Sequence, residues 1–374
     1  MGCDGLIIMC ILDVHYHEWR DWAMSGTILF ARDSNLERSW PFVAEALMAR
    51  LNAIGETRVV DVERGTPISE VTRLSDVTAI AMFGGKLSEA CVAGAPNLKA
   101  VGGVLDIGGH RNMPVDLMFE RGISIVDATR AWAPSVAECT LTLALNALRM
   151  IPQWHKRMAA GERLWNYKYA QFCDNPNFVN GTLGTKTVGV MGLGQIGGRV
   201  ALWCRALGSR VLGYDPFISK EKLDELGVES VEMDDLVDAC DVVFVTIPPT
   251  PSAEKILSRE RIGRLKKGAL VVITTRAHAV DMAALRERIY ADELMGAFDV
   301  YDVEPLPEDD LLRNRPNVVH TPHIAGRTRD ANLMVAEVIA DDFERILKGE
   351  APHSRLSREA IAVREERKDL PKVG

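Results

Sequence analysis

The sequence lacks several features that identify nucleic-acid-binding, membrane or disulfide-rich proteins. Its formal net charge is −8, and no segment forms a concentrated basic stripe. We therefore expect neither a nucleic acid nor an anionic membrane surface as a partner. The seven cysteines are scattered and show neither a CxxC pair nor a metal-ligand spacing. We expect reduced thiols in a cytoplasmic protein and no metal site.

Long hydrophobic runs are missing as well. The apolar stretch from Leu6 to Leu12 is too short to span a bilayer, and no basic segment precedes it. It therefore does not have the pattern of a signal peptide. We interpret residues 1–26 as an N-terminal extension, and two explanations stay open: a disordered segment, or a start codon upstream of a true beginning at Met24.

What the chain does contain is an alternation of short apolar runs and amphipathic stretches, typical of α/β proteins. With 374 residues, 47% hydrophobic and 26% charged, it is long enough for two globular domains. The first series runs from residue 27 to residue 128 and includes TILFAR, TRVVDV, VTAIAMFG, KAVGGVLD and ISIVDA. Strands that alternate with helices predict a parallel sheet covered on both faces.

A second series begins at residue 187, after a long apolar segment, SVAECTLTLALNALRMI, that predicts a buried helix. Six strands are expected: TVGVMG, RVLGYD, DVVFVTIP, ALVVITT, MGAFDV and NVVHTP. Between the two series lies an aromatic-rich segment, residues 152–184, which is either an arm over a partner subunit or a loop. The last strong helix is TRDANLMVAEVIADDFERILKG, and residues 351–374 read as a loose polar tail.

The second series opens with a glycine motif that indicates a dinucleotide site. Gly192, Gly194 and Gly197 have the G-x-G-x-x-G spacing between an apolar strand and a helix, and a second strand ends in Asp215. In such a motif the first glycine permits a tight turn, the second lets the pyrophosphate approach the backbone, and the third lets helix pack on strand. A glycine turn without a ligand is the alternative.

Three details of this motif concern how a dinucleotide would bind and which one it would be. The helix that begins near Gln195 and Ile196 would direct free N–H groups at the phosphates. Asp215 can accept hydrogen bonds from the adenosine ribose hydroxyls, and its charge would repel a 2′-phosphate. No arginine follows in DPFISK. NAD is therefore expected in preference to NADP.

Polar residues follow three further strands of the second series. ALVVITTR ends in Arg276, MGAFDVYDVEPLP brings Asp299 and Glu304, and NVVHTPH brings His323. Ligands of open parallel sheets bind beyond the carboxyl ends of the strands, so these side chains are candidates for chemistry. The other histidine of this stretch lies inside the apolar run VVHTP and is expected to be a strand residue. Arg276 could instead be a surface residue, Glu304 part of a proline-flanked acidic loop, and His323 a helix-capping residue.

In the order and spacing of these motifs, the chain resembles the D-isomer-specific 2-hydroxyacid dehydrogenases. The resemblance is carried by GTLGTKTVGVMGLGQIG, IPPTPSAEKIL, ITTRAHAVD, AFDVYDVEPLP and TPHIAGRT, and more weakly by FERGISIVDATRAWAPSVAE. It implies a Rossmann NAD-binding domain and a flavodoxin-like substrate domain, both doubly wound. The expected division is residues 27–128 with 328–350 for the substrate domain and 129–327 for the NAD domain.

The resemblance also implies a mechanism in which a hydride passes between NAD(H) and a small 2-hydroxy or 2-oxo acid. Arg276 would bind the carboxylate and the reacting oxygen of the substrate, and His323 would exchange the proton. Glu304 would hydrogen-bond the other ring nitrogen and favour the imidazolium. Asp299 would contact the nicotinamide end, and the backbone of Thr274 and Thr275 the cofactor. A homodimer formed through the cofactor domain is implied by the same resemblance.

Two departures from the family pattern concern the substrate and the Arg276 segment. Ile273 and Ala277 stand where the family usually has Asn and Gly. In the first series, VGGVLDIGGHRNMPVD is longer than the usual substrate loop, although Gly108 and Gly109 could still offer backbone N–H groups to a carboxylate. Because this loop selects the substrate, the sequence does not name the acid.

Two other functions stay open at this point. One is a dinucleotide-sensing regulator that resembles the family's corepressors and has no metabolic turnover. The other is a dehydrogenase of the formate or phosphite type, although the formate type pairs its histidine with Gln rather than with a residue such as Glu304. Steady turnover of cofactor with 2-oxo acids would distinguish the first from an enzyme.

Overall fold

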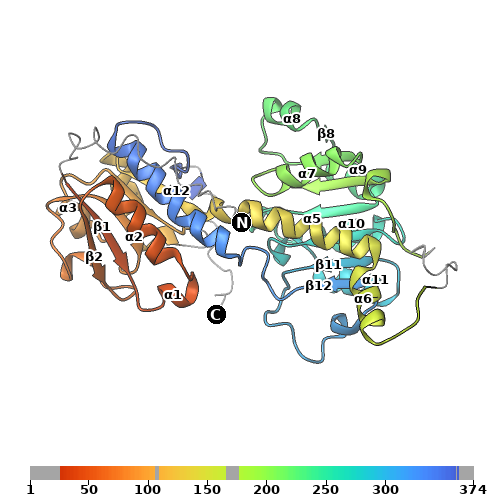
Figure 1. The fold of residues 1–374 in the computed structure, drawn as a ribbon. Helices are drawn as coiled ribbons and strands as arrows, with labels where there is room; N and C mark the ends of the chain where they lie inside the picture. Colours follow the sequence, from red (N-terminus) through yellow and green to blue (C-terminus); the bar gives the residue numbers. More distant parts are fainter. Residues whose placement is uncertain (1–25, 106–108, 166–176, 359, 362–374) are drawn as a thin grey trace, which may run out of the picture.

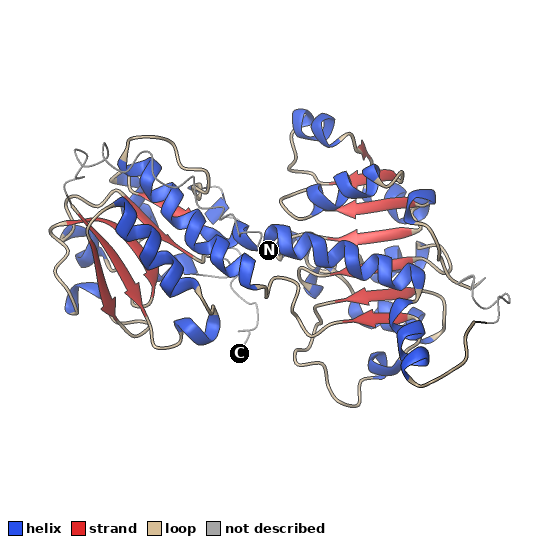
Figure 2. Cartoon of the chain, viewed as in Figure 1, coloured by secondary structure: helices blue, strands red, loops and turns tan. Residues whose placement is uncertain are grey.

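The computed structural model describes residues 26–105, 109–165, 177–358 and 360–361. The chain forms two lobes, each built on one parallel sheet with helices on both faces (Figures 1 and 2). The first sheet has the order β2-β1-β3-β4-β5, and the second has the order β12-β11-β10-β9-β6-β7-β8. In both sheets the strand order changes direction next to the first strand, as in doubly wound folds. The expected fold class is confirmed.

The first sheet is buried on both sides because its strands alternate between two apolar cores. Ile28 and Phe30 pack under α2 (Val43–Ile54) and α12 (Arg329–Leu347). Leu29 and Ala31 belong to the opposite core, with α3 and α4. The strands are β1 (Thr27–Arg32), β2 (Thr57–Asp61), β3 (Val77–Phe83), β4 (Ala100–Gly103) and β5 (Ser124–Asp127), and the other helices are α1 (Leu36–Ser39), α3 (Glu89–Ala93) and α4 (Val115–Glu120).

The second sheet contains the six expected strands and one short extra strand at its edge. Its strands are β6 (Thr187–Met191), β7 (Arg210–Tyr214), β8 (Glu229–Ser230), β9 (Val242–Val245), β10 (Leu270–Ile273), β11 (Met295–Phe298) and β12 (Val318–His320). The extra strand, β8, has only two residues, both exposed, so it has no apolar pattern to reveal it. One face is covered by α5 (Ala133–Arg149) and α7 (Gly197–Ala206), the other by α9 (Met233–Ala239), α10 (Arg259–Arg264) and α11 (Met282–Tyr290).

The remaining elements are short. They are α6 (Ile151–Ala159), α8 (Lys220–Leu226) and the 3-10 turns η1 (Ile68–Glu70), η2 (Gly109–Asn112), η3 (Ala128–Trp132), η5 (Leu183–Thr185), η6 (Pro251–Ala253), η7 (Ala277–Ala279) and η8 (Leu311–Asn314). Within the described ranges, none of the helices combines the length and the apolar character needed to cross a membrane.

The chain crosses between the lobes twice, and hydrogen bonds join the two crossings. The first crossing leads from η3 into α5, and the second leads from the end of the second sheet into α12, which returns to the first lobe (Figure 1). Ser135 Oγ donates to the Ala325 carbonyl at 2.8 Å, and Trp132 Nε1 donates to Asn332 Oδ1 at 3.3 Å. The first lobe is therefore discontinuous in sequence.

The aromatic-rich segment and the N-terminal extension are described only in part. Of the aromatic-rich segment, residues 152–165 and 177–184 are described: α6 ends at Ala159, and Val179 N donates to the Gly268 carbonyl at 2.8 Å. Whether the segment contacts a partner subunit stays a prediction, and residues 166–176 lie outside the described part. The expected extension, residues 1–26, also lies outside it apart from Gly26.

The expectation of a loose tail after the last helix is wrong for residues 351–358 and 360–361. This segment lies against the edge strand β5, where Asp127 N donates to the Ser354 carbonyl at 3.0 Å and Leu356 N to the Ile125 carbonyl at 2.8 Å. Leu356 and Ile361 are buried in the core of the first sheet. The backbone hydrogen bonds pair this segment with the sheet edge, and its few buried apolar side chains do not produce a recognisable sequence pattern.

Candidate active site

The glycine turn has the geometry that a bound pyrophosphate requires. Gly192 follows β6 with φ at 87°, a left-handed conformation that glycine adopts without strain. A Cβ atom on Gly197 would lie 1.9 Å from the Gly192 carbonyl oxygen, so only glycine lets α7 pack this closely. A Cβ on Gly194, by contrast, would meet nothing within 4 Å, and the residue is exposed. The open side of the turn is where a ligand can approach the backbone.

Asp215 lies beside this turn at the end of β7. Its Oδ2 accepts a hydrogen bond from Leu193 N at 2.8 Å, and its Oδ1 accepts one from Phe217 N at 3.0 Å. Each carboxylate oxygen can accept a second hydrogen bond, so the group can still bind hydroxyls. The half-buried Asp215 is thus fixed next to the open glycine backbone, and together they fit the ribose and pyrophosphate of a dinucleotide.

The start of α7 is held by contacts that the sequence did not indicate. Arg199 Nη1 donates to the backbone carbonyl of Gln195 at 2.5 Å and to its Oε1 at 3.0 Å. Thr246, after β9, donates from Oγ1 to the Gly192 carbonyl at 2.7 Å. Gln195 is exposed, whereas Ile196 is half-buried against the core beneath the helix. The signal available in the sequence for the role of Thr246 was a threonine directly after an apolar strand.

His323 and Glu304 form a hydrogen-bonded pair at the carboxyl edge of the sheet, beyond β11 and β12. His323 Nδ1 lies 2.6 Å from Glu304 Oε2, and both side chains are partly exposed. The second oxygen of Glu304 accepts a hydrogen bond from Tyr301 N at 2.9 Å, which fixes the carboxylate. Since Nδ1 is engaged by the carboxylate, Nε2 is the ring nitrogen that can exchange a proton with a substrate.

The loop that carries His323 is held by Asp299, whose carboxylate has no exposed surface. Its Oδ1 accepts hydrogen bonds from Thr321 Oγ1 at 2.6 Å and Ile324 N at 2.8 Å, and its Oδ2 accepts one from Ala325 N at 2.9 Å. His323 itself has a φ of 55°, and its N–H donates to the Asp299 carbonyl at 2.9 Å. These bonds compensate for the unusual backbone conformation. The expected contact of Asp299 with the nicotinamide end stays a prediction.

Arg276 follows β10, the neighbour of β11 in the sheet. It is half-buried, and its Nη1 donates to the Thr275 carbonyl at 2.8 Å. The two threonine side chains before it have structural contacts: Thr274 Oγ1 lies 2.5 Å from Thr140 Oγ1, and Thr275 Oγ1 donates to the Val245 carbonyl at 3.2 Å. Contact of their backbone with the cofactor therefore remains a prediction.

The strand order explains why these side chains belong to one edge. β10, β11 and β12 are adjacent and parallel, so the segments of Arg276, Glu304 and His323 leave the same edge of the sheet. His320 is the last residue of β12, as expected of a strand residue, and its Nε2 lies 3.2 Å from the Arg313 carbonyl oxygen. The structure thus pairs His323, not His320, with a carboxylate.

The substrate loop predicted in the first lobe is described only in part. Gly108 lies outside the described residues, and Gly109 begins η2. A Cβ atom on Gly109 would lie 3.0 Å from the Val104 carbonyl oxygen, a tight contact. The role of these two glycines in binding a substrate stays a prediction.

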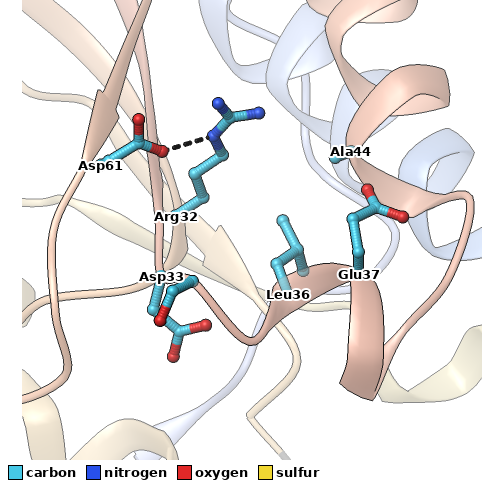
Figure 3. Close-up of a pocket in the computed structure, with 7 residues that line it drawn as sticks. Arg32, Asp33, Leu36, Glu37, Ala44 and Asp61 are labelled. Carbon is cyan, nitrogen blue, oxygen red and sulfur yellow. Dashed lines mark hydrogen bonds and ion pairs between the residues drawn. The ribbon is translucent and has the colours of Figure 1, made fainter.

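A cavity of about 250 Å³ lies elsewhere on the first lobe (Figure 3). Its lining contains none of the predicted site residues: it consists of Arg32, Asp33, Ser34, Leu36, Glu37, Ala44 and Asp61. Figure 3 shows Arg32 directed at Asp61, an ion pair of 2.7 Å, and Asp33 is paired with Arg64 at 2.6 Å. Arg32, Asp33 and Asp61 are thus engaged in ion pairs within the protein, which give no indication of a ligand.

Comparison with known proteins places the chain in a family. Residues 141–325 match the model described as D-isomer specific 2-hydroxyacid dehydrogenase, NAD binding domain. Over 267 residues the chain is 38% identical to a D-3-phosphoglycerate dehydrogenase of Archaeoglobus fulgidus, a match that covers 71% of this chain and 48% of that protein. The chain spans about half the length of this relative.

A shorter relative and a solved structure agree with this match. A glyoxylate reductase of Korarchaeum cryptofilum is 29% identical over 68% of this chain and 76% of its own length. The crystal structure of a phosphoglycerate oxidoreductase from Rhizobium etli superposes with a TM-score of 0.76 and 25% identity, and covers 89% of this chain and 99% of its own. The chain therefore belongs to the D-isomer specific 2-hydroxyacid dehydrogenases and contains the NAD-binding domain of that family.

Proposed function

We propose that this chain is an NAD-dependent oxidoreductase that interconverts a small 2-hydroxy acid and the corresponding 2-oxo acid. The observation that supports it best is the 2.6 Å contact between His323 Nδ1 and Glu304 Oε2, one strand away from the Arg276 segment. A proton donor, an anion-binding cation and a dinucleotide turn along one sheet edge are the groups that this reaction needs.

When bound in this site, NAD(H) would supply the hydride-transfer chemistry of the reaction in both directions. Arg276 binds the substrate carboxylate and polarises the reacting carbonyl, because a planar guanidinium can donate two parallel hydrogen bonds. His323 Nε2 gives its proton to the carbonyl oxygen as the C–H bond forms, and takes one from the hydroxyl in the reverse direction. Glu304 stabilises the imidazolium through Nδ1.

The cofactor would be held by the glycine turn and its surroundings. We assign the pyrophosphate to Gly192, Gly194 and Gly197 with the backbone of Gln195 and Ile196, and the adenosine ribose to Asp215. The backbone of Thr274 and Thr275 would line the nicotinamide side together with the Asp299 segment. This assignment is supported by the open backbone at Gly194 and by the fixed position of the Asp215 carboxylate.

The domain division and assembly belong to the same proposal. Residues 27–128 with 328–350 would bind the substrate, and residues 129–327 would bind NAD; the two separate sheets support this division. The relatives named above act on phosphoglycerate or glyoxylate, so a 2-oxo acid within this range of sizes is the proposed substrate class. We also propose a homodimer formed by the cofactor domain and a cytoplasmic location.

The test is a screen of 2-oxo acids with NADH and NADPH, followed by the matching 2-hydroxy acids with the oxidised cofactors. The panel runs from glyoxylate through pyruvate and hydroxypyruvate to its phosphorylated form. We expect steady, stoichiometric turnover with at least one acid and a preference for NADH. Saturable binding of NADH without turnover of any acid would contradict the enzymatic proposal and favour a dinucleotide-sensing regulator.

A further inference from the structure

Two loops at the carboxyl edge of the second sheet run alongside each other. The β9 loop (residues 246–257) and the β10 loop (residues 274–281) are joined by backbone hydrogen bonds near their carboxyl-terminal ends. Lys255 N donates to the His278 carbonyl at 2.9 Å, and Leu257 N donates to the Ala279 carbonyl at 3.0 Å. These bonds fix the far end of the β9 loop, near α10, but not its first half.

The first half of the β9 loop is attached by a side chain. His278 Nε2 lies 3.1 Å from the backbone carbonyl oxygen of Thr250. A carbonyl oxygen can only accept, so Nε2 carries the hydrogen in this contact. Thr250 is buried and its carbonyl also accepts a hydrogen bond from Ala253 N at 3.0 Å, so His278 binds a well-defined turn of the loop rather than a free end.

The β9 loop lies between the glycine turn and the Arg276 segment, so a contact that fixes this loop bears on both. β9 lies between β6, which leads into the glycine turn, and β10, which leads into the Arg276 segment. At one side, the loop packs on the glycine turn: a Cβ atom on Gly192 would lie 3.1 Å from the backbone of Ile247. At the other side, His278 joins it to the β10 loop, two residues after Arg276.

We propose that His278 is a positioning residue: it fixes the β9 loop against the β10 loop. It thereby maintains the position of the glycine turn relative to Arg276. This inference rests on the proposed function, because it assumes that the dinucleotide lies along this edge. His278 is not expected to contact substrate or cofactor. Its contribution is a single donated hydrogen bond that restricts the loop before the cofactor binds.

Three substitutions isolate that hydrogen bond. The terminal amide nitrogen of glutamine lies as many bonds from Cα as histidine Nε2, so His278→Gln can still donate to Thr250. The amide nitrogen of asparagine is one bond closer and corresponds to Nδ1, so His278→Asn loses the contact while it keeps a polar side chain. His278→Ala removes the side chain altogether. Equal melting temperatures of the Gln and Asn variants would establish that both are folded alike.

The first measurement is the affinity for NADH, by fluorescence titration of the purified proteins in the absence of any acid. We expect His278→Asn and His278→Ala to raise the Kd for NADH roughly three- to tenfold, the effect of one hydrogen bond, and His278→Gln to stay close to the native protein. An Asn variant that binds NADH as tightly as the native chain, or a Gln variant that loses as much as the Asn variant, would overturn the proposal.

The second measurement is hydrogen exchange of the backbone amides between Pro251 and Leu257 without cofactor. Exchange should be faster in His278→Asn than in the native protein and slow again in His278→Gln; equal rates in both variants would also overturn the proposal. Neither measurement uses turnover. If the chain binds NADH but turns over no acid, the proposed function fails while the role of His278 is still decided.

Discussion

His323 and Glu304 are 19 residues apart in the sequence, yet His323 Nδ1 lies 2.6 Å from Glu304 Oε2. Neither group is held by this contact alone. The backbone of Tyr301 fixes the other carboxylate oxygen, and the buried Asp299 carboxylate holds the loop on both sides of the histidine. A preorganised pair of this kind can exchange a proton without first paying the cost of ordering its groups.

The Glu304 carboxylate should matter for turnover and not for cofactor binding. Glu304→Gln keeps the size of the side chain but removes the charge that stabilises the imidazolium. We expect kcat to fall by roughly 10- to 100-fold, at the lower end of what acid–base catalysis contributes, while the Kd for NADH stays unchanged. Steady-state kinetics and NADH titration of the same preparation check this. An unaltered kcat would mean that the pair has no part in proton transfer.

Substitution of Asp299 distinguishes between two roles of its carboxylate: holding the His323 loop, or contacting the nicotinamide end of the cofactor. In Asp299→Asn the amide group can accept on one side only, so either Ala325 N or Ile324 N loses its acceptor. If the carboxylate holds the loop, kcat should fall by at least roughly tenfold with little change in NADH affinity. A selective loss of NADH affinity would instead indicate contact with the nicotinamide end.

Thr321→Val should give a smaller effect in the same direction, and Thr321→Ser, which keeps the hydroxyl bound to Asp299, should restore activity.

Asp215 is expected to select between NAD and NADP. Asp215→Ala removes the carboxylate that would bind the ribose hydroxyls and repel a 2′-phosphate. We expect weaker binding of NADH and a higher ratio of NADPH to NADH affinity, both measured by titration. The same substitution removes the acceptor of Leu193 N and Phe217 N, so the melting temperature must be followed as a control. An unchanged ratio would show that Asp215 does not face the ribose.

The acid stability of the first lobe should depend on Asp76, which joins the amino ends of three strands. Burial opposes ionisation of its carboxyl, but hydrogen bonds from Arg58, the backbone and Thr27 outweigh this and lower the pKa from 3.8 to about 2. A carboxyl with a lowered pKa stabilises the folded state at higher pH, and the contribution is lost as the pH falls from 3.8 toward about 2. Asp76→Asn should therefore be less stable than the native protein at neutral pH, and the difference should disappear in acid. Urea unfolding at several pH values measures this, with the exposed Glu229→Gln as a control that changes little.

The residues of the candidate site could be named from the sequence where a single short segment sets the geometry. Gly192 is required by its own left-handed φ and Gly197 by its close approach to the Gly192 carbonyl oxygen five residues earlier, and both glycines appear directly in the spacing. His323, Glu304 and Arg276 could be found because each follows a strand with a clear apolar pattern. The hydrogen bonds of Asp299 to the His323 loop could not be predicted, because its partners lie more than 20 residues away and its burial cannot be read from the motif.

Other features were hidden for a similar reason. In the described part of the segment, residues 351–358 and 360–361, few apolar side chains reach the core, chiefly Leu356 and Ile361, so its composition resembles that of a free tail. His278 looks like an ordinary loop residue until the β9 loop is seen beside it. Sequence patterns report burial along one element, whereas these contacts join elements that the chain order does not bring together.

The central claim is that His323 exchanges the proton while Arg276 holds the acid, and one set of kinetic measurements tests it most directly. With the acid identified by the screen, kcat and KM are measured at saturating NADH for the native chain, His323→Ala, Arg276→Ala and the matched control His320→Ala. We predict that the first two variants lose at least roughly 100-fold in kcat/KM but bind NADH nearly as before, and that His320→Ala stays close to native. Near-native turnover in His323→Ala or Arg276→Ala, or an equal loss in His320→Ala, would contradict the account.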